Sequence, residues 1–281
     1  MNSKLTCALI LFILMIMSFA MADEINVIPH EISSVSAVKT VRSGVDKRNN
    51  TLRTKQAKVV AHRGSAHWEE NTLIAFQNFA STGADAVELD ARSCLDGTQV
   101  IFHDSNITAN GIRYKVSALT LDQLRMLKPS VCTLDEALEA IAQSGKDIFL
   151  ELKETADGVK CVNSVQSRGL LSRTVFFSFY ETPLKQVHSA FPAAALGLSL
   201  KKGTNPYSKK LIKKAKKLHI SFFMANKRIV NKKVVRHWHK KGFAVYVWTI
   251  NNLKNMRSFY RMGVDGILTD YPEYAIAAKS K

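Results

Sequence analysis

Two histidines, an arginine and two carboxylates lie between residues 62 and 104 of this chain, each at or near the end of an apolar run. His62 and Arg63 follow the first of these runs. Glu88 and Asp90 lie in the second run, and His103 ends the third. Side chains at the ends of parallel strands gather on one face of a barrel or sheet. Histidine, carboxylate and arginine together suit a metal-assisted attack on a phosphate.

The carboxylates have the spacing expected of a metal site. Glu88 and Asp90 are two residues apart, so on a strand both side chains point to the same side. Glu151 ends another apolar run, and Lys153 shares its side. A divalent cation such as Mg²⁺ or Ca²⁺ prefers oxygen ligands and relieves the repulsion between such carboxylates. A buried Glu–Lys ion pair without a cation is the alternative, but the accompanying histidines and arginine favour the metal site.

The remaining polar residues suit the other steps of phosphate chemistry. His62 and His103 are candidates for a general acid and a general base, because an unperturbed histidine titrates at about 6.5. Arg63 could grip a phosphate through its planar fork, and Lys153 could add a point charge. Trp248 ends a later apolar run, where it either stacks on the substrate or packs in the core.

The elements that would carry these residues alternate along the chain. Strand-like runs lie at Lys58–Gly64, Ala86–Ala91, Val100–His103, Ile148–Lys153, Thr174–Phe179, Ala195–Leu200, Ser221–Ala225, Ala244–Ile250 and Gly266–Thr269. Helical patterns lie at residues 71–81, 133–144, 158–169, 181–190, 208–218, 231–241 and 252–262. Strands that alternate with helices in one domain predict a parallel α/β fold.

One of the nine runs does not fit a parallel sheet. Only residues 93–99 separate the third run from the second, which is too short for a parallel crossover. Asp96-Gly97 is a strong signal for a two-residue hairpin turn, and a turn centred there places Asp90 opposite His103. The hairpin leaves eight strands, the number of a TIM (β/α)8 barrel.

The N-terminal residues suggest an exported protein. Residues 1–22 have the pattern of a secretory signal peptide, with Ala20-Met21-Ala22 as the cleavage site. A membrane anchor is the alternative, but the apolar run is short for a span of roughly 20 residues. We therefore expect a periplasmic or secreted protein. Residues 23–56 read as a polar, poorly ordered arm, and residues 57–281 as one barrel domain.

Three cysteines remain once the signal peptide is removed. Cys94, Cys132 and Cys161 are an odd number and lack metal-binding spacing. We predict buried single thiols, with one optional disulfide left open.

The net charge is +17, and much of it lies late in the chain. We expect most of these lysines and arginines to lie on solvated helix faces. The basic C-terminal half would also attract anionic substrates and make weak contact with anionic membrane surfaces. No nucleic-acid partner is expected, because no known reader motif accompanies the charge.

Several short motifs occur together in one order. They are His62-Arg63-Gly64, Glu70-Asn71-Thr72, Gly83-Ala84-Asp85, Glu88-Leu89-Asp90, Asp96-Gly97, His103-Asp104, Glu151-Leu152-Lys153, Trp248-Thr249-Ile250-Asn251 and Gly263-Val264-Asp265-Gly266-Ile267-Leu268-Thr269-Asp270. This set resembles the glycerophosphodiester phosphodiesterase family from about Lys58 to Pro272. One departure is Glu69, which stands where the family usually has proline before Glu-Asn-Thr.

The resemblance implies a TIM barrel with a small insertion at residues 105–131, after His103-Asp104. It implies a divalent metal, Mg²⁺ or Ca²⁺, on Glu88, Asp90 and Glu151. It further implies the following roles for the remaining residues: an acid–base pair of His62 and His103, phosphate contacts from Arg63 and Lys153, and Glu70 close to the metal site.

The activity implied by the resemblance is hydrolysis of small glycerophosphodiesters to glycerol 3-phosphate and an alcohol. A lysophospholipase D or sphingomyelinase D activity on lipid substrates is the alternative, since such enzymes use a related barrel. A secreted barrel that only binds phospho-ligands or membranes through its basic face is a third hypothesis. It is disfavoured because binding alone does not require two histidines beside a metal site.

Overall fold

The computed structural model describes Leu52 and residues 56–279 of the 281-residue chain. The predicted signal peptide and most of the predicted arm therefore lie outside the described residues. Within the described part, no helix is long and apolar enough to cross a membrane.

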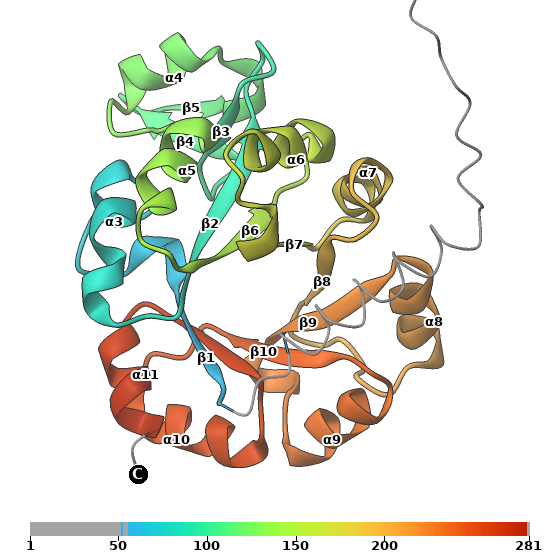
Figure 1. Ribbon diagram of the computed structural model, residues 1–281. Coiled ribbons are helices and arrows are strands. Elements are labelled where there is room, and N and C mark those ends of the chain that lie inside the picture. The colour runs from blue at the N-terminus through green and yellow to red at the C-terminus, as the bar shows by residue number, and fades with distance from the viewer. Residues whose placement is uncertain (1–51, 53–55, 280–281) are drawn as a thin grey trace, which may run out of the picture. The chain divides into compact units, whose positions relative to one another are not determined.

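Eight parallel strands close into a barrel, as predicted (Figure 1). Closure follows from the two partners of β1, which pairs with β2 on one side and with β11 on the other. In order around the barrel the strands are β1 (Lys58–Ala61), β2 (Ala86–Ser93), β6 (Asp147–Leu152), β7 (Thr174–Ser178), β8 (Ala195–Leu200), β9 (Ile220–Asn226), β10 (Ala244–Trp248) and β11 (Gly266–Thr269).

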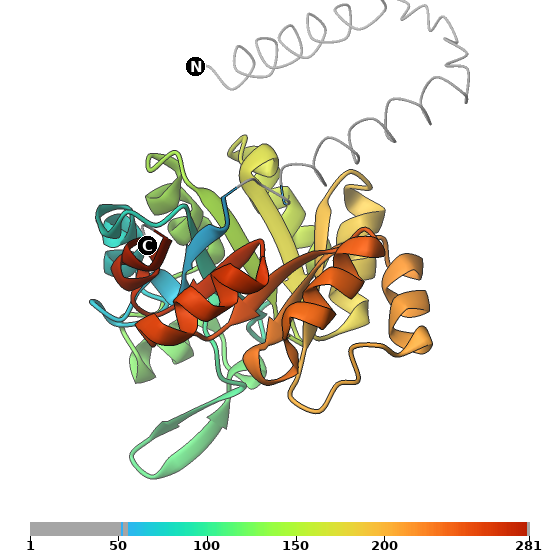
Figure 2. The ribbon, with the colours of Figure 1, turned by 90° about the horizontal axis from the view of Figure 1, so that it is seen from below.

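Helices surround the barrel, and each sequence-predicted helix is present (Figures 1 and 2). They are α3 (Leu73–Asn78), α5 (Leu134–Ala142), α6 (Gly158–Ser167), α7 (Glu181–Ala190), α8 (Lys209–Lys217), α9 (Lys232–Lys240), α10 (Leu253–Met262) and α11 (Pro272–Lys279), of which α11 was not predicted. The predicted capping box opens α5. Thr133 Oγ1 accepts from Glu136 N at 3.1 Å, and Glu136 Oε2 accepts from Thr133 N at 2.8 Å.

The strands are apolar on both faces because both faces are covered. One face packs against the helices in the larger core. The other face fills the barrel interior with a smaller cluster, whose buried members are Leu52, Val60, Ala86, Phe149, Phe177, Ala195, Phe222, Met224, Ala244, Tyr246 and Leu268. Leu52 belongs to the predicted arm, yet it is only 4% exposed, and its carbonyl accepts from Tyr246 Oη at 3.3 Å.

The predicted hairpin is present, but its predicted register was wrong. β3 (Gln99–Ile101) runs antiparallel to β2, with Ala91 opposite Ile101. Phe102 N donates to Asp90 O at 2.8 Å, so Asp90 lies opposite Phe102 and not His103. The reason is the turn. Cys94 N donates to Thr98 O at 2.9 Å, which leaves three loop residues ending at Gly97 with φ 79°, the left-handed position of a three-residue loop.

The insertion after His103-Asp104 is a small unit without a long helix, as predicted. It contains a hairpin of β4 (Asn106–Ala109) and β5 (Ile112–Lys115), followed by α4 (Leu121–Leu127). The hairpin extends away from the barrel (Figure 2). A separate cluster of Cys94, Val100, Val116, Leu124 and Val131 joins the insertion to the β2–β3 hairpin.

The three cysteines are free and buried, which confirms the prediction of single thiols. Burial is the main cause of their raised thiol pKa values, which are about 11 for Cys94 and about 12 for Cys132.

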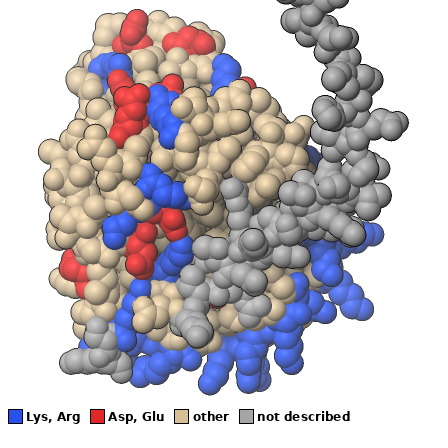
Figure 3. All heavy atoms as spheres, in the orientation of Figure 1, with Lys and Arg blue, Asp and Glu red and all other residues tan. Residues whose placement is uncertain are grey.

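The positive charge has an unusual distribution. No Asp or Glu occurs between Glu181 and Asp265, and that stretch holds nineteen Lys and Arg. Many of them lie on α8, α9 and α10, and basic side chains gather along the lower edge of the molecule in Figure 3. Among the described Lys and Arg of this stretch, only Lys185 and Lys214 pair with a carboxylate, that of Glu181.

Candidate active site

The loop after β1 positions the first two candidate residues through a strained backbone. His62–Gly64 form a short turn in which Arg63 has φ 52° and Gly64 has φ 97°. A Cβ on Gly64 would lie 2.5 Å from Ala75 Cβ on α3, so the helix packs directly on this glycine. Ser65 and Asn71 in the same loop also have positive φ. Such strain concentrates at functional sites.

The three predicted metal ligands come together at the carboxyl ends of β2 and β6. The strand register pairs Asp90 directly with Glu151, and Glu88 lies two residues earlier on β2. Glu88, Asp90 and Glu151 each offer an oxygen, and these oxygens lie within 4.8 Å of one another. All three side chains are buried. Among the described residues this is the one group of its kind.

Two cations balance part of the acidic cluster. Lys153 Nζ lies 2.7 Å from Asp90 Oδ1 and 3.0 Å from Glu151 Oε1. Arg63 Nε lies 3.3 Å from Asp90 Oδ2, and the Arg63 backbone N–H donates to Glu88 Oε2 at 2.9 Å. The predicted phosphate-binding residues therefore touch the predicted metal ligands.

The local environment shifts the pKa values of the three carboxyl groups in different directions. Burial, reinforced by the charges of Asp90 and Glu151, raises the pKa of Glu88 well above its usual range. Burial also raises the pKa of Glu151 to about 7, against the opposing charge of Lys153. For Asp90, burial is outweighed by the charges of Lys153 and Arg63, which hold its pKa below the usual range.

The cluster suits a divalent metal ion. In their ionised forms the three buried carboxylates exceed by one charge the two described cationic side chains that contact them, Arg63 and Lys153, and a bound cation would offset this excess. Asp90 Oδ1 and Glu151 Oε1 are also buried and lack an aligned hydrogen bond among the described residues, although Lys153 lies close to both. A set of oxygen donors fits Mg²⁺ or Ca²⁺ better than a softer metal.

Each candidate histidine has a carboxylate at its Nδ1 atom. His62 Nδ1 lies 2.5 Å from Asp270 Oδ1, and His103 Nδ1 lies 2.7 Å from Asp104 Oδ1. When Nδ1–H donates to the carboxylate, Nε2 keeps its lone pair and can accept a proton. His103 is also held through its backbone, because Arg92 Nε and Nη2 donate to His103 O at 3.1 and 2.6 Å.

His103 lies close enough to the acidic cluster for the charges there to shift its pKa, although the hairpin register differs from the predicted one. Burial lowers this pKa below 6.5, and the charges of Lys153 and Arg63 lower it further. The charge of Asp90 and the bond to Asp104 oppose this effect. The net effect lowers the pKa of His103 and favours its neutral form.

The loop that departs from the family pattern bridges to the insertion. Glu69, at the position where proline was expected, forms an ion pair with Lys128, the residue after α4. Glu70 binds Arg63 Nη1 with both carboxylate oxygens at 2.8 Å, so it holds a phosphate-binding candidate beside the cluster. Asn71 Nδ2 donates to Asp90 Oδ2 at 2.8 Å.

Trp248 lies half-buried at the end of β10, away from the carboxylate cluster in the strand order. Its Nε1 donates to Met224 O at 3.0 Å, and its ring lies edge-on to Phe179 with centroids 5.8 Å apart. It packs partly in the interior and partly at the rim, so the two interpretations left open by the sequence are not exclusive.

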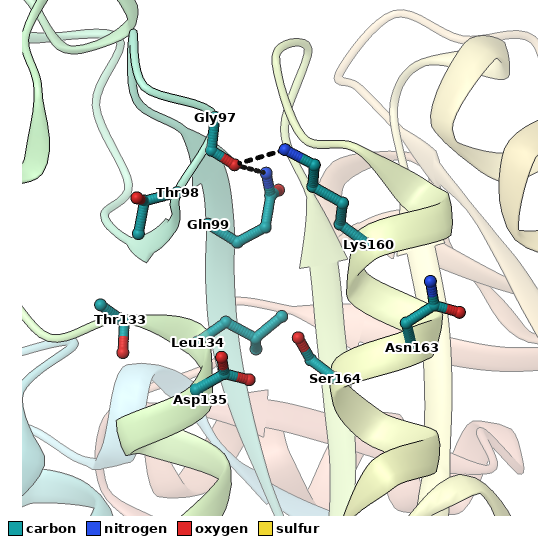
Figure 4. Close-up of a pocket in the computed structure, with 9 residues that line it drawn as sticks. All are labelled: Gly97, Thr98, Gln99, Thr133, Leu134, Asp135, Lys160, Asn163 and Ser164. Atoms are coloured by element: carbon teal, nitrogen blue, oxygen red, sulfur yellow. Dashed lines mark hydrogen bonds between the residues drawn. The ribbon is translucent and has the colours of Figure 1, made fainter. Parts of the chain in front are cut away.

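A separate pocket lies outside the barrel, between the β2–β3 turn, α5 and α6 (Figure 4). Its volume is about 380 Å³, and its lining residues are Gly97, Thr98, Gln99, Thr133, Leu134, Asp135, Lys160, Asn163 and Ser164. Lys160 and Gln99 both donate to Gly97 O, at 3.0 and 3.2 Å. The Lys160 bond ties the hairpin turn to α6, and the Gln99 bond lies within the hairpin. None of the predicted site residues lines this pocket.

The sequence did not assign a role to four residues that contact the site: Asp104, Asp270, Asn71 and Asn251. Asn251 Oδ1 accepts from Asp270 N at 3.0 Å, and its Nδ2 donates to Asp270 Oδ2. Polar residues directly after strand ends were a usable signal for Asp104 and Asp270. Only the folded chain reveals their partners.

A family model decides the identity of this fold and site. Residues 62–274 match the model described as the glycerophosphoryl diester phosphodiesterase family. The chain belongs to this family. The match runs from the first candidate histidine to the start of α11, so it covers every strand of the glycerophosphodiester phosphodiesterase barrel after β1.

Individual relatives agree with the family. The chain is 29% identical over 238 residues to a glycerophosphodiester phosphodiesterase from Caldanaerobacter subterraneus subsp. tengcongensis, covering 78% of this chain and 96% of the relative. It is 24% identical to a lysophospholipase D from Rattus norvegicus, covering 76% and 83% of the two chains. A phosphodiesterase structure from Oleispira antarctica, in complex with sn-glycerol-3-phosphate, has a TM-score of 0.72 at 23% identity, covering 83% of this chain and 99% of that chain.

Proposed function

We propose that the protein is a metal-dependent phosphodiesterase that hydrolyses small glycerophosphodiesters to glycerol 3-phosphate and an alcohol. The observation that carries the proposal is the assembly of three buried carboxylates with two histidines whose Nδ1 atoms are held by carboxylates. Family membership and the named glycerophosphodiester phosphodiesterase relative support the same activity.

In this proposal Glu88, Asp90 and Glu151 hold the metal, Mg²⁺ or Ca²⁺. When bound, a divalent cation supplies positive charge to the phosphate and lowers the pKa of a coordinated hydroxyl group. Arg63 and Lys153, which already contact these carboxylates, would hold the phosphate oxygens as its charge develops. Glu70 keeps the Arg63 guanidinium at the site.

The histidines would share the proton transfers. His103, whose lowered pKa favours the neutral imidazole, would accept the proton of the attacking hydroxyl at Nε2. His62 would donate a proton from Nε2 to the departing alcohol oxygen, and Asp270 would stabilise the charged imidazole through Nδ1.

Purified protein should release glycerol 3-phosphate from a panel of diesters with choline, ethanolamine, glycerol or inositol head groups. EDTA should stop the release, and a divalent ion should restore it. A failure to release glycerol 3-phosphate from every diester, with each of Mg²⁺, Ca²⁺ and Mn²⁺, would contradict the proposal.

A lysophospholipase D activity is the second candidate. The relative from Rattus norvegicus carries this name, and the insertion exposes two apolar side chains, Ile112 at 56% and Met126 at 75%. Exposed apolar residues on one unit can contact an acyl chain or a membrane. Turnover of lysophosphatidylcholine above that of every small diester would make this activity the main one.

Two further proposals concern location. We propose export with cleavage after Ala22, which N-terminal sequencing of the mature protein tests. We also propose weak contact between anionic membranes and the exposed lysines of α8 and α9. Co-sedimentation with anionic but not zwitterionic vesicles, lost at high salt, would support this contact.

A further inference from the structure

The inward-facing residues of β7, β8 and β10 form a second part of the barrel rim. Phe177 and Tyr246 belong to the interior cluster, so the side chains two residues further along the same strands face the same way. The alternation reaches Phe179 after β7 and Trp248 at the end of β10. On β8 it runs from Ala195 to Ser199, and Lys201 directly follows the strand. In the strand order β8 lies across the barrel from β1, β10 lies across from β6, and β7 is the neighbour of β6 (Figure 1).

Ser199 is the first sign that this part of the rim receives a ligand. Its side chain is inward-facing and only 6% exposed. Its Oγ atom has no hydrogen-bond partner among the described residues. Buried hydroxyl groups are nearly always hydrogen-bonded, so an unpartnered one at the rim of a site is suited to a polar group of the substrate.

Lys201 is the second sign. Its Nζ lies 5.3 Å from the centroid of the Phe179 ring, a cation–π distance. Within the described residues it pairs with no carboxylate, and the sequence from residue 182 to residue 264 contains none. Trp248 backs the Phe179 ring edge-on at 5.8 Å, and its indole is held by Met224 O.

We infer that Phe179, Ser199, Lys201 and Trp248 receive the alcohol part of the diester and select polyhydroxylated alcohols without positive charge over quaternary ammonium alcohols. The inference rests on the proposed phosphodiesterase activity and adds its head-group preference. The carboxylate cluster lies on β2 and β6, and β7 pairs directly with β6, so a diester whose phosphate is held there can extend its alcohol along this part of the rim.

Two opposing effects act on a choline head group. Aromatic rings such as Phe179 and Trp248 would attract a quaternary ammonium. Here the protein's own ammonium, that of Lys201, already lies over the Phe179 ring, and it repels a second cation. A polyol avoids the repulsion, offers hydroxyls to Ser199 Oγ, and lays its C–H groups on the rings. Repulsion between two unit charges at about 6 Å in a partly hydrated site gives a preference of roughly three- to tenfold or more.

The test compares kcat/KM for glycerophosphoinositol with that for glycerophosphocholine in the full chain with saturating metal. Wild-type protein should favour the inositol diester at least about threefold. Lys201→Met should lower this ratio by raising turnover of the choline diester, and Lys201→Arg should keep it. Ser199→Ala should raise KM for the inositol diester about three- to tenfold with little change in kcat.

Lys202→Met is the matched control. Lys202 is adjacent in sequence and, like Lys201, exposed after the end of β8, but the cation–π contact with Phe179 is made by Lys201. Its substitution removes the same charge and should leave the ratio unchanged. A wild-type preference for the choline diester, equal turnover of both diesters, or an equal shift in Lys202→Met would overturn the inference alone. No hydrolysis of any diester would overturn the proposed function and this inference with it.

Discussion

His62 and Asp270 are 208 positions apart in the chain, yet His62 Nδ1 and Asp270 Oδ1 lie 2.5 Å apart. The contact exists because β1 and β11 are neighbours in the closed barrel, with Ala61 opposite Thr269. Each residue directly follows its strand, so closure of the barrel brings the imidazole and the carboxylate together. The side-chain bond and the charge of His62 hold the pKa of Asp270 below its usual range despite partial burial.

Asp270→Asn should lower kcat/KM about 100-fold or more while leaving the fold intact. An amide in place of the carboxylate no longer fixes the Nδ1–H tautomer or stabilises the charged imidazole. Steady-state kinetics with the best diester measures the effect. Asp135→Asn removes an exposed carboxylate that pairs with Arg168 and serves as the control, with activity unchanged. Full activity in Asp270→Asn would remove Asp270 from the mechanism.

The activity should fall as the pH falls through the pKa of His103, which lies below 6.5. The direction of this pH dependence follows from the proposed role of His103 as a base. A base must be neutral to accept a proton, so the enzyme is active above this pKa and inactive below it. Asp104→Asn removes a contact that raises this pKa, so the acid limb should move to lower pH. A pH profile of kcat/KM at saturating metal tests both statements, and an acid limb above 6.5 contradicts them.

The sequence predicted the strands and helices well because the patterns that indicate them are local. Strand and helix periodicity, the capping box at Thr133 and the polar residues after each strand are all properties of short segments. The hairpin register failed because Asp96-Gly97 fits two loop types, and a three-residue loop shifts every facing pair by one position. The contact between His62 and Asp270 forms only when the barrel closes. The contact of both Glu70 oxygens with Arg63 forms only when the loop folds. No local pattern could therefore predict either contact.

Gly64→Ala should destabilise the protein by about 2 kcal/mol or more and reduce activity. Two causes add at this position: φ is 97°, and the new Cβ would lie 2.5 Å from Ala75 Cβ. Gly145→Ala distinguishes the cost of the backbone conformation from the cost of the steric clash. Gly145 has φ 68° with no atom within 4 Å of its Cβ position, so its substitution carries the backbone cost alone, about 1 kcal/mol. Urea unfolding of both variants measures the difference, and equal losses would show that α3 can move away from Gly64.

Glu88→Gln should stabilise the metal-free protein while abolishing its activity. Burial and the charges of Asp90 and Glu151 raise the pKa of Glu88, so the folded metal-free cluster disfavours its charged form, and an uncharged amide removes that cost. The amide oxygen of glutamine can still accept the Arg63 backbone N–H that Glu88 accepts at 2.9 Å.

Differential scanning calorimetry in EDTA should then show a higher Tm for Glu88→Gln than for wild type. About 3 °C corresponds to roughly 1 kcal/mol in a domain of this size. Added Mg²⁺ or Ca²⁺ should raise the wild-type Tm, because the ion binds the folded cluster and not the unfolded chain. The variant should lose most of that increase. Glu139→Gln, which removes an exposed partner of Arg168, controls for a general charge effect. A lower Tm for Glu88→Gln in EDTA would mean that Arg63 and Lys153 already balance the cluster, and that the site does not require the metal's charge.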